Sequence, residues 1–187
     1  MTLATLVTAE PTILPVMESE TLYEIVDGKR VEKPPMGNFQ AVLASLLVQR
    51  LGNHAWSEGL GRVVCEALFR INPAGGPQRR PDVAFVSYAR WARDRKITSE
   101  NGWDVVPDLA VEVVSPSDLA EDVVEKVHEY LRAGVSRVWL VHATVRQVWC
   151  FESTAKVVIW GPGESLDGGD LLPGLTLSID ELFEDGA

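Results

Sequence analysis

The chain has 187 residues, of which 46% are hydrophobic, and its formal net charge is −10. This length and composition fit one domain with a hydrophobic core of ordinary size. The acidic balance repels phosphate backbones at long range, so it disfavours a nucleic-acid partner without excluding one, because a local patch can oppose the overall charge.

Cysteine usage and the N-terminal stretch favour a soluble, cytoplasmic protein. Cys65 and Cys150 lie far apart and form no CxxC or Cys/His cluster, so neither a zinc site nor a disulfide framework is indicated. Residues 1–20 contain no Lys or Arg, unlike a secretory signal, and no apolar run approaches the roughly 20 residues that cross a membrane. We expect residues 1–20 to be an N-terminal lead and residues 21–187 to form a single domain.

The first predicted elements are a hairpin and a helix. Asp27-Gly28, between the two short runs of LYEIVDGKRVEKPP, is a strong hairpin signal. The segment FQAVLASLLVQRLG has apolar residues at helical spacing, and Gly52 is a candidate C-cap. Two strands are predicted next, over residues 61–71 and 81–87. A short basic helix or loop, YARWARDRK, follows them.

The second half alternates strands and helices before it closes in a meander. PDLAVEVVS, residues 107–115, is a strand that is apolar on both faces. Residues 115–134 form the clearest helix, with Ser and Asp at its start and Gly134 at its end. The remaining predicted elements are strands over 135–142, 145–152 and 155–160, then a strand and a short helix within 171–184. The fold class is therefore α/β, with one mixed sheet flanked by helices and an N-terminal β-hairpin.

Acidic residues interrupt three of these strands: Glu24, Asp82 and Glu112. Each one alone is explained more simply by a water-facing position or by an arginine partner, since strands often carry polar residues on one face. Glu112 is harder to explain in this way, because its strand is apolar on both sides. A bare carboxylate there costs several kcal/mol unless it is paired, protonated or bound to a cation.

Lys126 is the predicted partner of Glu112. On a helical wheel it lies at the border of the apolar stripe formed by Val123, Val127 and Tyr130, so it can reach back to the preceding strand. Carboxylate oxygens suit Mg²⁺, which usually takes one or two carboxylates and keeps several waters. The acids and the lysine together predict a site for Mg²⁺ or Mn²⁺ that acts on a phosphate.

Several motifs in this order resemble the Uma2 family, a branch of the PD-(D/E)XK nuclease superfamily whose members are described as putative restriction endonucleases. The segments that carry the resemblance are YEIVDG (23–28), RPDVAFVS (80–87), PDLAVEVVSPSD (107–118), EKVHEYLRAGVSRVWLV (125–141) and LLPGLTLSIDELF (171–183). The Pro-Asp pair alone is weak evidence for membership of the family, whereas the whole set of segments in this order is strong evidence.

The resemblance implies a restriction-endonuclease-like core over residues 21–187, with Asp82 and Glu112 as metal ligands and the backbone carbonyl of Val113 as a further one. The lysine expected two residues after the acid is replaced by Val114, and in this branch Lys126 supplies it from the following helix. Glu24 matches an extra acid of such nucleases, which orients Lys126 or holds a second metal. Phe39 stands where relatives often carry His, so any role at that place does not transfer.

The function expected from these residues is a metal-dependent endonuclease that hydrolyses nucleic-acid phosphodiester bonds, with DNA as the expected substrate and a homodimer as the expected assembly. Two alternatives stay open: a non-catalytic nucleic-acid-binding protein, and a protein-interaction module in which the acids and Lys126 form a buried salt-bridge network. A basic stretch, formed by Arg90, Arg93, Arg95 and Lys96 with Arg79 and Arg80 nearby, is either a phosphate-contacting patch or a solvated face that also pairs with acids of the protein.

Overall fold

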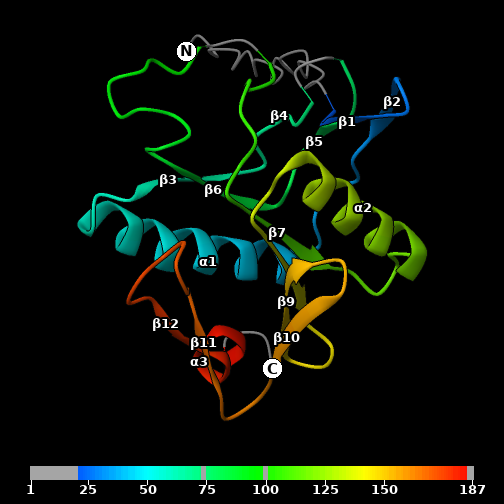
Figure 1. Cartoon of the computed structure of the whole chain (residues 1–187). Coiled ribbons are helices and arrows are strands. Elements are labelled where there is room, and N and C mark those ends of the chain that lie inside the picture. The colour runs from blue at the N-terminus through cyan, green and yellow to red at the C-terminus, as the bar shows by residue number, and fades with distance from the viewer. Residues whose placement is uncertain (1–20, 73–74, 99–100, 185–187) are drawn as a thin grey trace, which may run out of the picture.

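A twisted central sheet organises the protein, and helices α1 and α2 lie on its two sides (Figure 1). The computed structural model describes residues 21–72, 75–98 and 101–184. The expected lead over residues 1–20 lies outside these ranges. Within the described ranges the strand order of the central sheet is β10-β9-β8-β7-β6-β3. These strands are β3 (Gly61–Cys65), β6 (Val83–Ser87), β7 (Leu109–Val114), β8 (Arg137–His142), β9 (Gln147–Ser153) and β10 (Lys156–Trp160).

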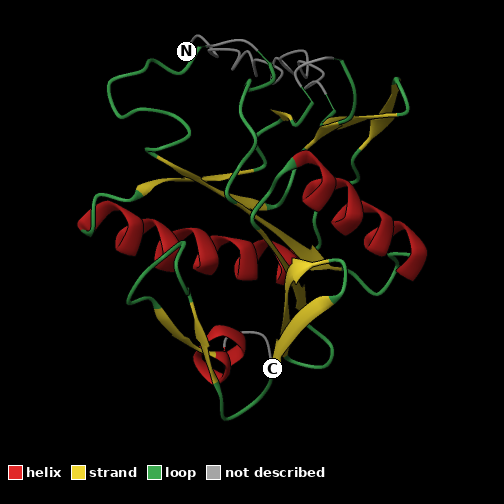
Figure 2. Ribbon diagram, viewed as in Figure 1, coloured by secondary structure: helices red, strands yellow, loops and turns green. Residues whose placement is uncertain are grey.

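The sheet is mixed, as the sequence predicts. Strands β7 and β8 are parallel, and α2 (Ala120–Ala133) makes the crossover between them. The other neighbouring pairs are antiparallel. A crossover helix must pack on one face of the sheet, so α2 necessarily covers the strand that precedes it. Figure 2 shows α2 and α1 at different angles on the two sides of the strands.

Two hydrophobic clusters fill the space on the two faces. On the α1 side, Leu47 and Leu51 of α1 (Asn38–Ser57) pack against Phe85 and Val111 of the sheet. The hydrophobic cluster on the α2 side is smaller. It contains Val127 and Tyr130 of α2 and small sheet residues such as Ala84 and Ala110. Because side chains alternate along β7, Val111 and Val113 face α1 while Ala110 and Glu112 face α2.

A second, smaller sheet lies beside the central one and carries the N-terminal hairpin. Its order is β2-β1-β5-β4, formed by β1 (Tyr23–Val26), β2 (Lys29–Glu32), β4 (Phe69–Arg70) and β5 (Gln78–Arg79). The predicted hairpin is confirmed, with positive φ at both turn residues, Asp27 and Gly28. This sheet brings β1 next to β5, although more than 50 residues of sequence separate them. At the C-terminal end, strands β11 (Ser165–Asp167) and β12 (Thr176–Ser178) pair, and α3 (Ile179–Phe183) packs near α1.

Some predicted boundaries are wrong for identifiable reasons. Gly52 is not a C-cap: α1 continues to Ser57 and is capped at Glu58, because the buried face of the helix outweighs the weak helix propensity of one glycine. The strand predicted over 61–71 is broken by Glu66, whose φ is 46°. Ser and Asp do not cap α2, whose N-cap is Leu119; Ser115 and Asp118 instead close a turn before it.

Other expectations hold. Gly134 ends α2 in the left-handed conformation, with φ of 94°. Cys65 and Cys150 are free thiols. The basic segment YARWARDRK is a turn and loop, whose Trp91 is buried against Trp103. In the part of the chain that the structure describes, no helix is long and apolar enough to cross a membrane.

Two glycine substitutions should change stability in opposite directions. Gly134→Ala should lower the free energy of unfolding by about 1 kcal/mol, because the left-handed conformation strains any residue with a Cβ although the space around it is open. Gly52→Ala should raise it by up to about 1 kcal/mol, because the position is inside α1 and the added methyl meets the Val63 side chain at an ordinary 3.9 Å. Urea denaturation of both variants measures the difference; equal effects of the two would contradict the boundaries of α1 and α2.

Candidate functional site

The end of the β6–β7 ladder brings Asp82 and Glu112 to the same cavity. Val83 of β6 pairs with Val111 of β7 as the last pair of the ladder, and Asp82 and Glu112 are the next residues beyond it on their two segments. The ladder opens there, and Oδ2 of Asp82 accepts the N–H of Val113 at 2.7 Å. The side chain of Asp82 thus accepts the Val113 N–H just beyond the last β6–β7 pair.

Glu112 is held by helix α2. Its Oε1 accepts the hydroxyl of Tyr130 at 2.7 Å, and its Oε2 lies 3.4 Å from the Lys126 ammonium. Only 9% of Glu112 is exposed, so this carboxylate has little contact with water and depends mainly on these two partners. Lys126 comes from the border of the buried stripe of α2, as the helical wheel predicts, because Val127 and Tyr130 beside it face the sheet.

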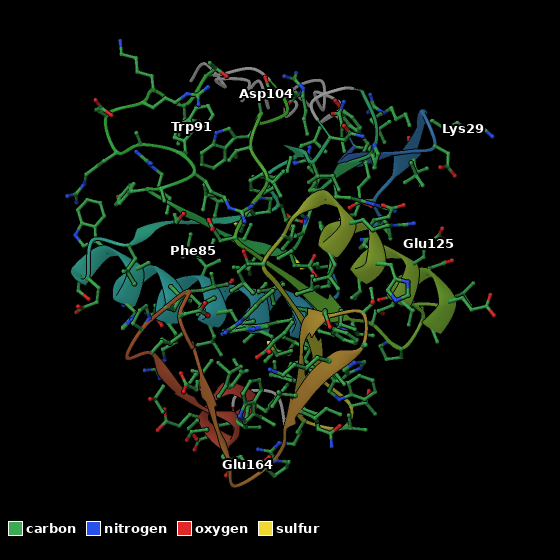
Figure 3. The ribbon with its side chains drawn as sticks, viewed as in Figure 1. Lys29, Phe85, Trp91, Asp104, Glu125 and Glu164 are labelled. Atoms are coloured by element: carbon green, nitrogen blue, oxygen red, sulfur yellow. The ribbon has the colours of Figure 1, made fainter. Side chains whose placement is uncertain are left out.

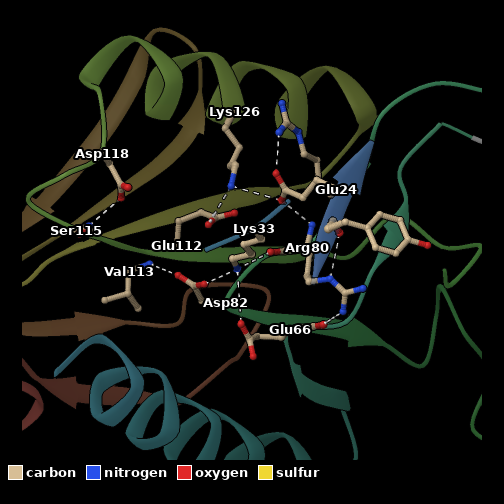
Figure 4. Close-up of polar contacts among 12 residues, drawn as sticks. Glu24, Lys33, Glu66, Arg80, Asp82, Glu112, Val113, Ser115, Asp118 and Lys126 are labelled. Atoms are coloured by element: carbon tan, nitrogen blue, oxygen red, sulfur yellow. Dashed lines mark hydrogen bonds and ion pairs between the residues drawn. The ribbon is translucent and has the colours of Figure 1, made fainter. Parts of the chain in front are cut away.

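Glu24 joins the cluster from the small sheet. Its Oε1 accepts the backbone N–H of Arg80 at 2.8 Å and lies 3.4 Å from the Lys126 ammonium, while its Oε2 accepts from the Arg79 guanidinium at 2.9 Å. The ammonium of Lys126 therefore sits between two carboxylates from two different sheets (Figure 4). With both oxygens engaged, Glu24 is arranged to orient Lys126.

Lys33 is a member of this cluster that the sequence reasoning missed. Its ammonium lies 2.6 Å from Oδ1 of Asp82, donates to the carbonyl of Arg80 at 2.9 Å, and is 4.0 Å from Oε1 of Glu66. Lys33 follows β2 directly and precedes Pro34-Pro35. These prolines restrict the backbone after Lys33. That rigidity is the one sequence feature that marks the position of Lys33.

Three arginines of the expected basic patch, Arg79, Arg80 and Arg90, donate to groups of the protein itself, whereas Arg93, Arg95 and Lys96 are exposed. Arg79 is 6% exposed and donates to both Glu24 and Glu129, which ties β5 to α2. Arg80 is 8% exposed and donates to the carbonyls of Tyr23 and Glu66. Arg90 pairs with Asp108 at 2.9 Å. Burial removes Arg79 and Arg80 from any phosphate-contacting surface, so that part of the patch interpretation is wrong.

The cluster opens into a cavity of about 510 Å³. Its charged lining includes Lys33, Asp82, Glu112 and Lys126, and the loop over residues 114–119 forms another side. Figure 4 shows Asp82, Lys33 and Glu112 close together from three different segments of the chain, with Lys126 above them on α2. A buried salt-bridge network without a cleft would have no such opening, so small molecules or a substrate segment can reach these side chains.

The two buried carboxyls have opposite protonation tendencies. Burial raises the pKa of Glu112, and the charges of Asp82 and Glu24 add to this effect, while Lys126 and Lys33 only partly oppose it. Burial also acts to raise the pKa of Glu24, but Lys126, the Arg80 N–H and Arg79 outweigh it and hold that pKa below its ordinary value. For Lys126, burial lowers the pKa and the two carboxylates more than reverse this, so the pKa is raised and the ammonium stays charged.

The donor set fits a hard divalent cation. Mg²⁺ is commonly bound by one or two carboxylates, with water completing its shell. Asp82 and Glu112 supply two carboxylates at the cavity, and the carbonyl of Val113 faces the same neighbouring strand as its N–H. No group of three or more His, Cys, Asp or Glu side chains is arranged to hold a metal within the ranges that the structure describes. Asp82, Glu112 and the Val113 carbonyl are the groups that would hold such an ion here.

The fold and the site together define a restriction-endonuclease-like protein. A crystal structure described as "a putative nuclease belonging to DUF820 from Anabaena variabilis ATCC 29413" superimposes with a TM-score of 0.76; it is 21% identical, and the match covers 90% of this chain and 93% of that one. At this identity the likeness establishes the fold. A search of curated proteins found no match.

The family follows from the sequence match. The model of the Uma2 family, described as "Putative restriction endonuclease", matches residues 9–180. The chain belongs to the Uma2 family, and the predicted resemblance is confirmed.

Two carboxyl-to-amide substitutions should show opposite dependence on pH when measured with a chelator present. The folded-state pKa of Glu112 is raised, so the wild type loses stability as pH rises above the ordinary carboxyl range of about 4.3. The stability of Glu112→Gln relative to wild type should therefore increase over that range. The folded-state pKa of Glu24 is lowered, so its stabilisation is present above about pH 4.3 and is lost as pH falls through the lowered pKa. Glu24→Gln should accordingly approach the wild type only at low pH.

Urea denaturation across pH 3–8 is the measurement, and Glu125→Gln is the control. Glu125 is exposed on α2 next to Lys126 (Figure 3), so this variant removes one negative charge without entering the cluster. Parallel pH profiles for Glu24→Gln and Glu112→Gln would show that the two carboxyls are not distinguished by their surroundings.

Proposed function

We propose that this protein is a metal-dependent endonuclease that hydrolyses phosphodiester bonds of nucleic acid, with DNA as the substrate. The observation that carries the proposal is the convergence of Asp82, Glu112 and Lys126 at a cavity of about 510 Å³ in a chain of a restriction-endonuclease family. Two carboxylates and a protonated lysine at one opening match the requirements of phosphoryl chemistry, which needs a cation site and a charged donor near the phosphate.

In this proposal Asp82, Glu112 and the Val113 carbonyl hold Mg²⁺ or Mn²⁺. When bound, such an ion lowers the pKa of a water ligand and screens the charge of the phosphate. Lys33 now pairs with Asp82, so ion binding requires its ammonium to share or release that carboxylate. A released Lys33 remains beside the cavity, where it would meet a phosphate oxygen.

Lys126 acts as a charged donor. Its pKa is raised by Glu112 and Glu24, which favours the charged ammonium form. It is suited to donate a hydrogen bond to a phosphate oxygen as negative charge develops there. Glu24 positions it: Arg79 and the Arg80 N–H fix the Glu24 carboxylate, which in turn fixes the ammonium.

A non-catalytic role in nucleic-acid or protein binding is the second candidate, and the close pairing of Lys33 with Asp82 favours it. With that pair, Asp82, Glu112 and Glu24 all have a cationic partner within 3.5 Å. A cluster neutralised in this way can stabilise the fold without binding an ion. The response of the protein to divalent ions separates the two candidates.

Divalent ions should stabilise the wild type in thermal melts. Binding to the folded state alone contributes RT ln(1 + [L]/Kd), about 2.7 kcal/mol at 100 Kd. Asp82→Asn should abolish most of this rise and should also destabilise the metal-free protein, because Lys33 loses its closest carboxylate. If repulsion between the acids of the cluster were the only effect, Asp82→Asn would make the metal-free protein more stable. Loss of the ion pair with Lys33 acts in the opposite direction.

Asp118→Asn is the matched control for this measurement. Asp118 lines the same cavity but accepts the Ser115 N–H at 2.8 Å and belongs to a turn. Its variant should keep the full response to Mg²⁺. No response in the wild type, with destabilised Asp82→Asn, would favour the non-catalytic network.

Cleavage assays test the activity itself. Plasmid and single-stranded DNA should be cut by the wild type with Mg²⁺ or Mn²⁺, and Asp82→Ala and Lys126→Met should both abolish cutting. Double-strand cleavage would also require two sites, for which we propose a homodimer. A wild type that binds DNA but cuts neither substrate with any divalent ion would contradict the proposal.

A further inference from the structure

A second cavity, of about 330 Å³, lies beside the candidate active site. Gln40, in the first turn of α1, lines both cavities. Pro116 lines the second one, and its chain neighbours Ser115 and Ser117 line the first. The two cavities are therefore neighbours that share part of their walls.

Arg146 supplies the charge of this cavity. It lies in the turn between β8 and β9 in the left-handed conformation, with φ of 54°. Its Nε is buried and has no hydrogen-bond partner among the described residues, and its terminal nitrogen is 3.9 Å from Oδ1 of Asp180, too far for a hydrogen bond. The Arg146 side chain as a whole is 39% exposed and its terminal nitrogen faces Asp180, so an anionic oxygen bound here would give the buried Nε the acceptor that it lacks among the described residues.

The start of α1 adds to this positive potential. Its N-cap, Gly37, makes no side-chain hydrogen bond, and its first turn contains no acidic residue. The first turn of a 20-residue helix carries partial positive charge from its free N–H groups. Phe39 and Gln40 of this turn line the cavity, whereas the N-cap Gly37 lines the first one, so the positive potential of the helix end is shared by the two cavities.

Apolar surface forms much of the remaining wall. Phe39, Pro116 and Ala143 line it, and Thr144 adds a hydroxyl. Aromatic rings beside arginines are typical of sites that accept nucleobases, since every base has a flat face for stacking. A volume near 330 Å³ is within the range of small-molecule sites.

We propose that this cavity binds the nucleotide next to the scissile phosphodiester, with its phosphate at Arg146 and its base against Phe39. The inference rests on the proposed nuclease function for the role of the subsite in cleavage. The binding of a nucleotide at this place can be measured without any cleavage.

The direct test is an NMR titration of the ¹⁵N-labelled full chain with deoxyadenosine monophosphate, without divalent ions. Backbone amides of residues 39–40 and 143–146 should shift saturably. Deoxyadenosine and inorganic phosphate, which each keep half of the ligand, should shift the same amides with weaker affinity. Shifts confined to the Asp82 cavity, or no saturable shift at all, would overturn the proposal.

Arg146→Met should weaken the nucleotide by about tenfold, the usual effect of losing one charge-assisted hydrogen bond. Arg50→Met is the matched control, because Arg50 is half-exposed and also has one long ion pair to α3, 3.8 Å from Oε2 of Glu181. Arg50 does not line this cavity. Equal affinities of the two variants would overturn the assignment of Arg146, and thermal melts verify that both variants fold.

A cleavage arm separates failure of the subsite from failure of the nuclease function. If the wild type cuts single-stranded DNA, Arg146→Met should raise KM about tenfold and change kcat little, while Arg50→Met should change neither. Active enzyme with an unchanged KM in Arg146→Met would remove the subsite and leave the nuclease. If the wild type binds the nucleotide but does not cleave DNA, the subsite stands and the nuclease function is rejected.

Discussion

The carboxylate of Glu112, buried in an apolar strand, is the constraint on which this region of the protein depends. Its two partners, Tyr130 and Lys126, come from one helix and lie four residues apart, so they share the face that packs on the sheet. The position of α2 over β7 is therefore specified by polar contacts as well as by the apolar stripe of the helix. Removing one partner leaves a buried charge without compensation, which is among the costlier changes a core can undergo.

Charge pairing then extends outward from Glu112 in a connected order. Lys126 links it to Glu24, Arg79 links Glu24 to Glu129, and Glu129 is again on α2. The small sheet is in this way attached to the helix that covers the large one. These pairs contain buried groups with few exposed atoms, so solvent and salt screen them less than surface ion pairs. The same contacts that join the two sheets also hold the lysine ammonium at the cavity.

An acidic protein that acts on nucleic acid needs local positive charge where the phosphate binds. Lys33 and Lys126 face the first cavity, Arg146 faces the second, and the start of α1 lines both. Three arginines outside these cavities, Arg79, Arg80 and Arg90, are used internally and donate to carboxylates and carbonyl oxygens. The net charge of −10 is thus a property of the whole chain, whereas the two cavities carry local positive charge. Long-range steering of a polyanion remains weak in such a protein, so recognition depends on short-range contacts.

The amino-acid sequence alone determined the α/β class, the hairpin at Asp27-Gly28, the αL end of α2 and the strands of the meander, since each follows from local periodicity or turn chemistry. It also singled out Asp82, Glu112 and Lys126, because acids in apolar strands and a lysine at the border of a stripe are visible without coordinates. The roles of Lys33, Arg79 and Arg146 were decided by tertiary structure. Their partners Asp82, Glu24 and Asp180 lie 34 to 55 residues away in the sequence. Pairings over such separations depend on the order and register of the strands. No local pattern in the sequence shows which distant side chains this order and register bring together.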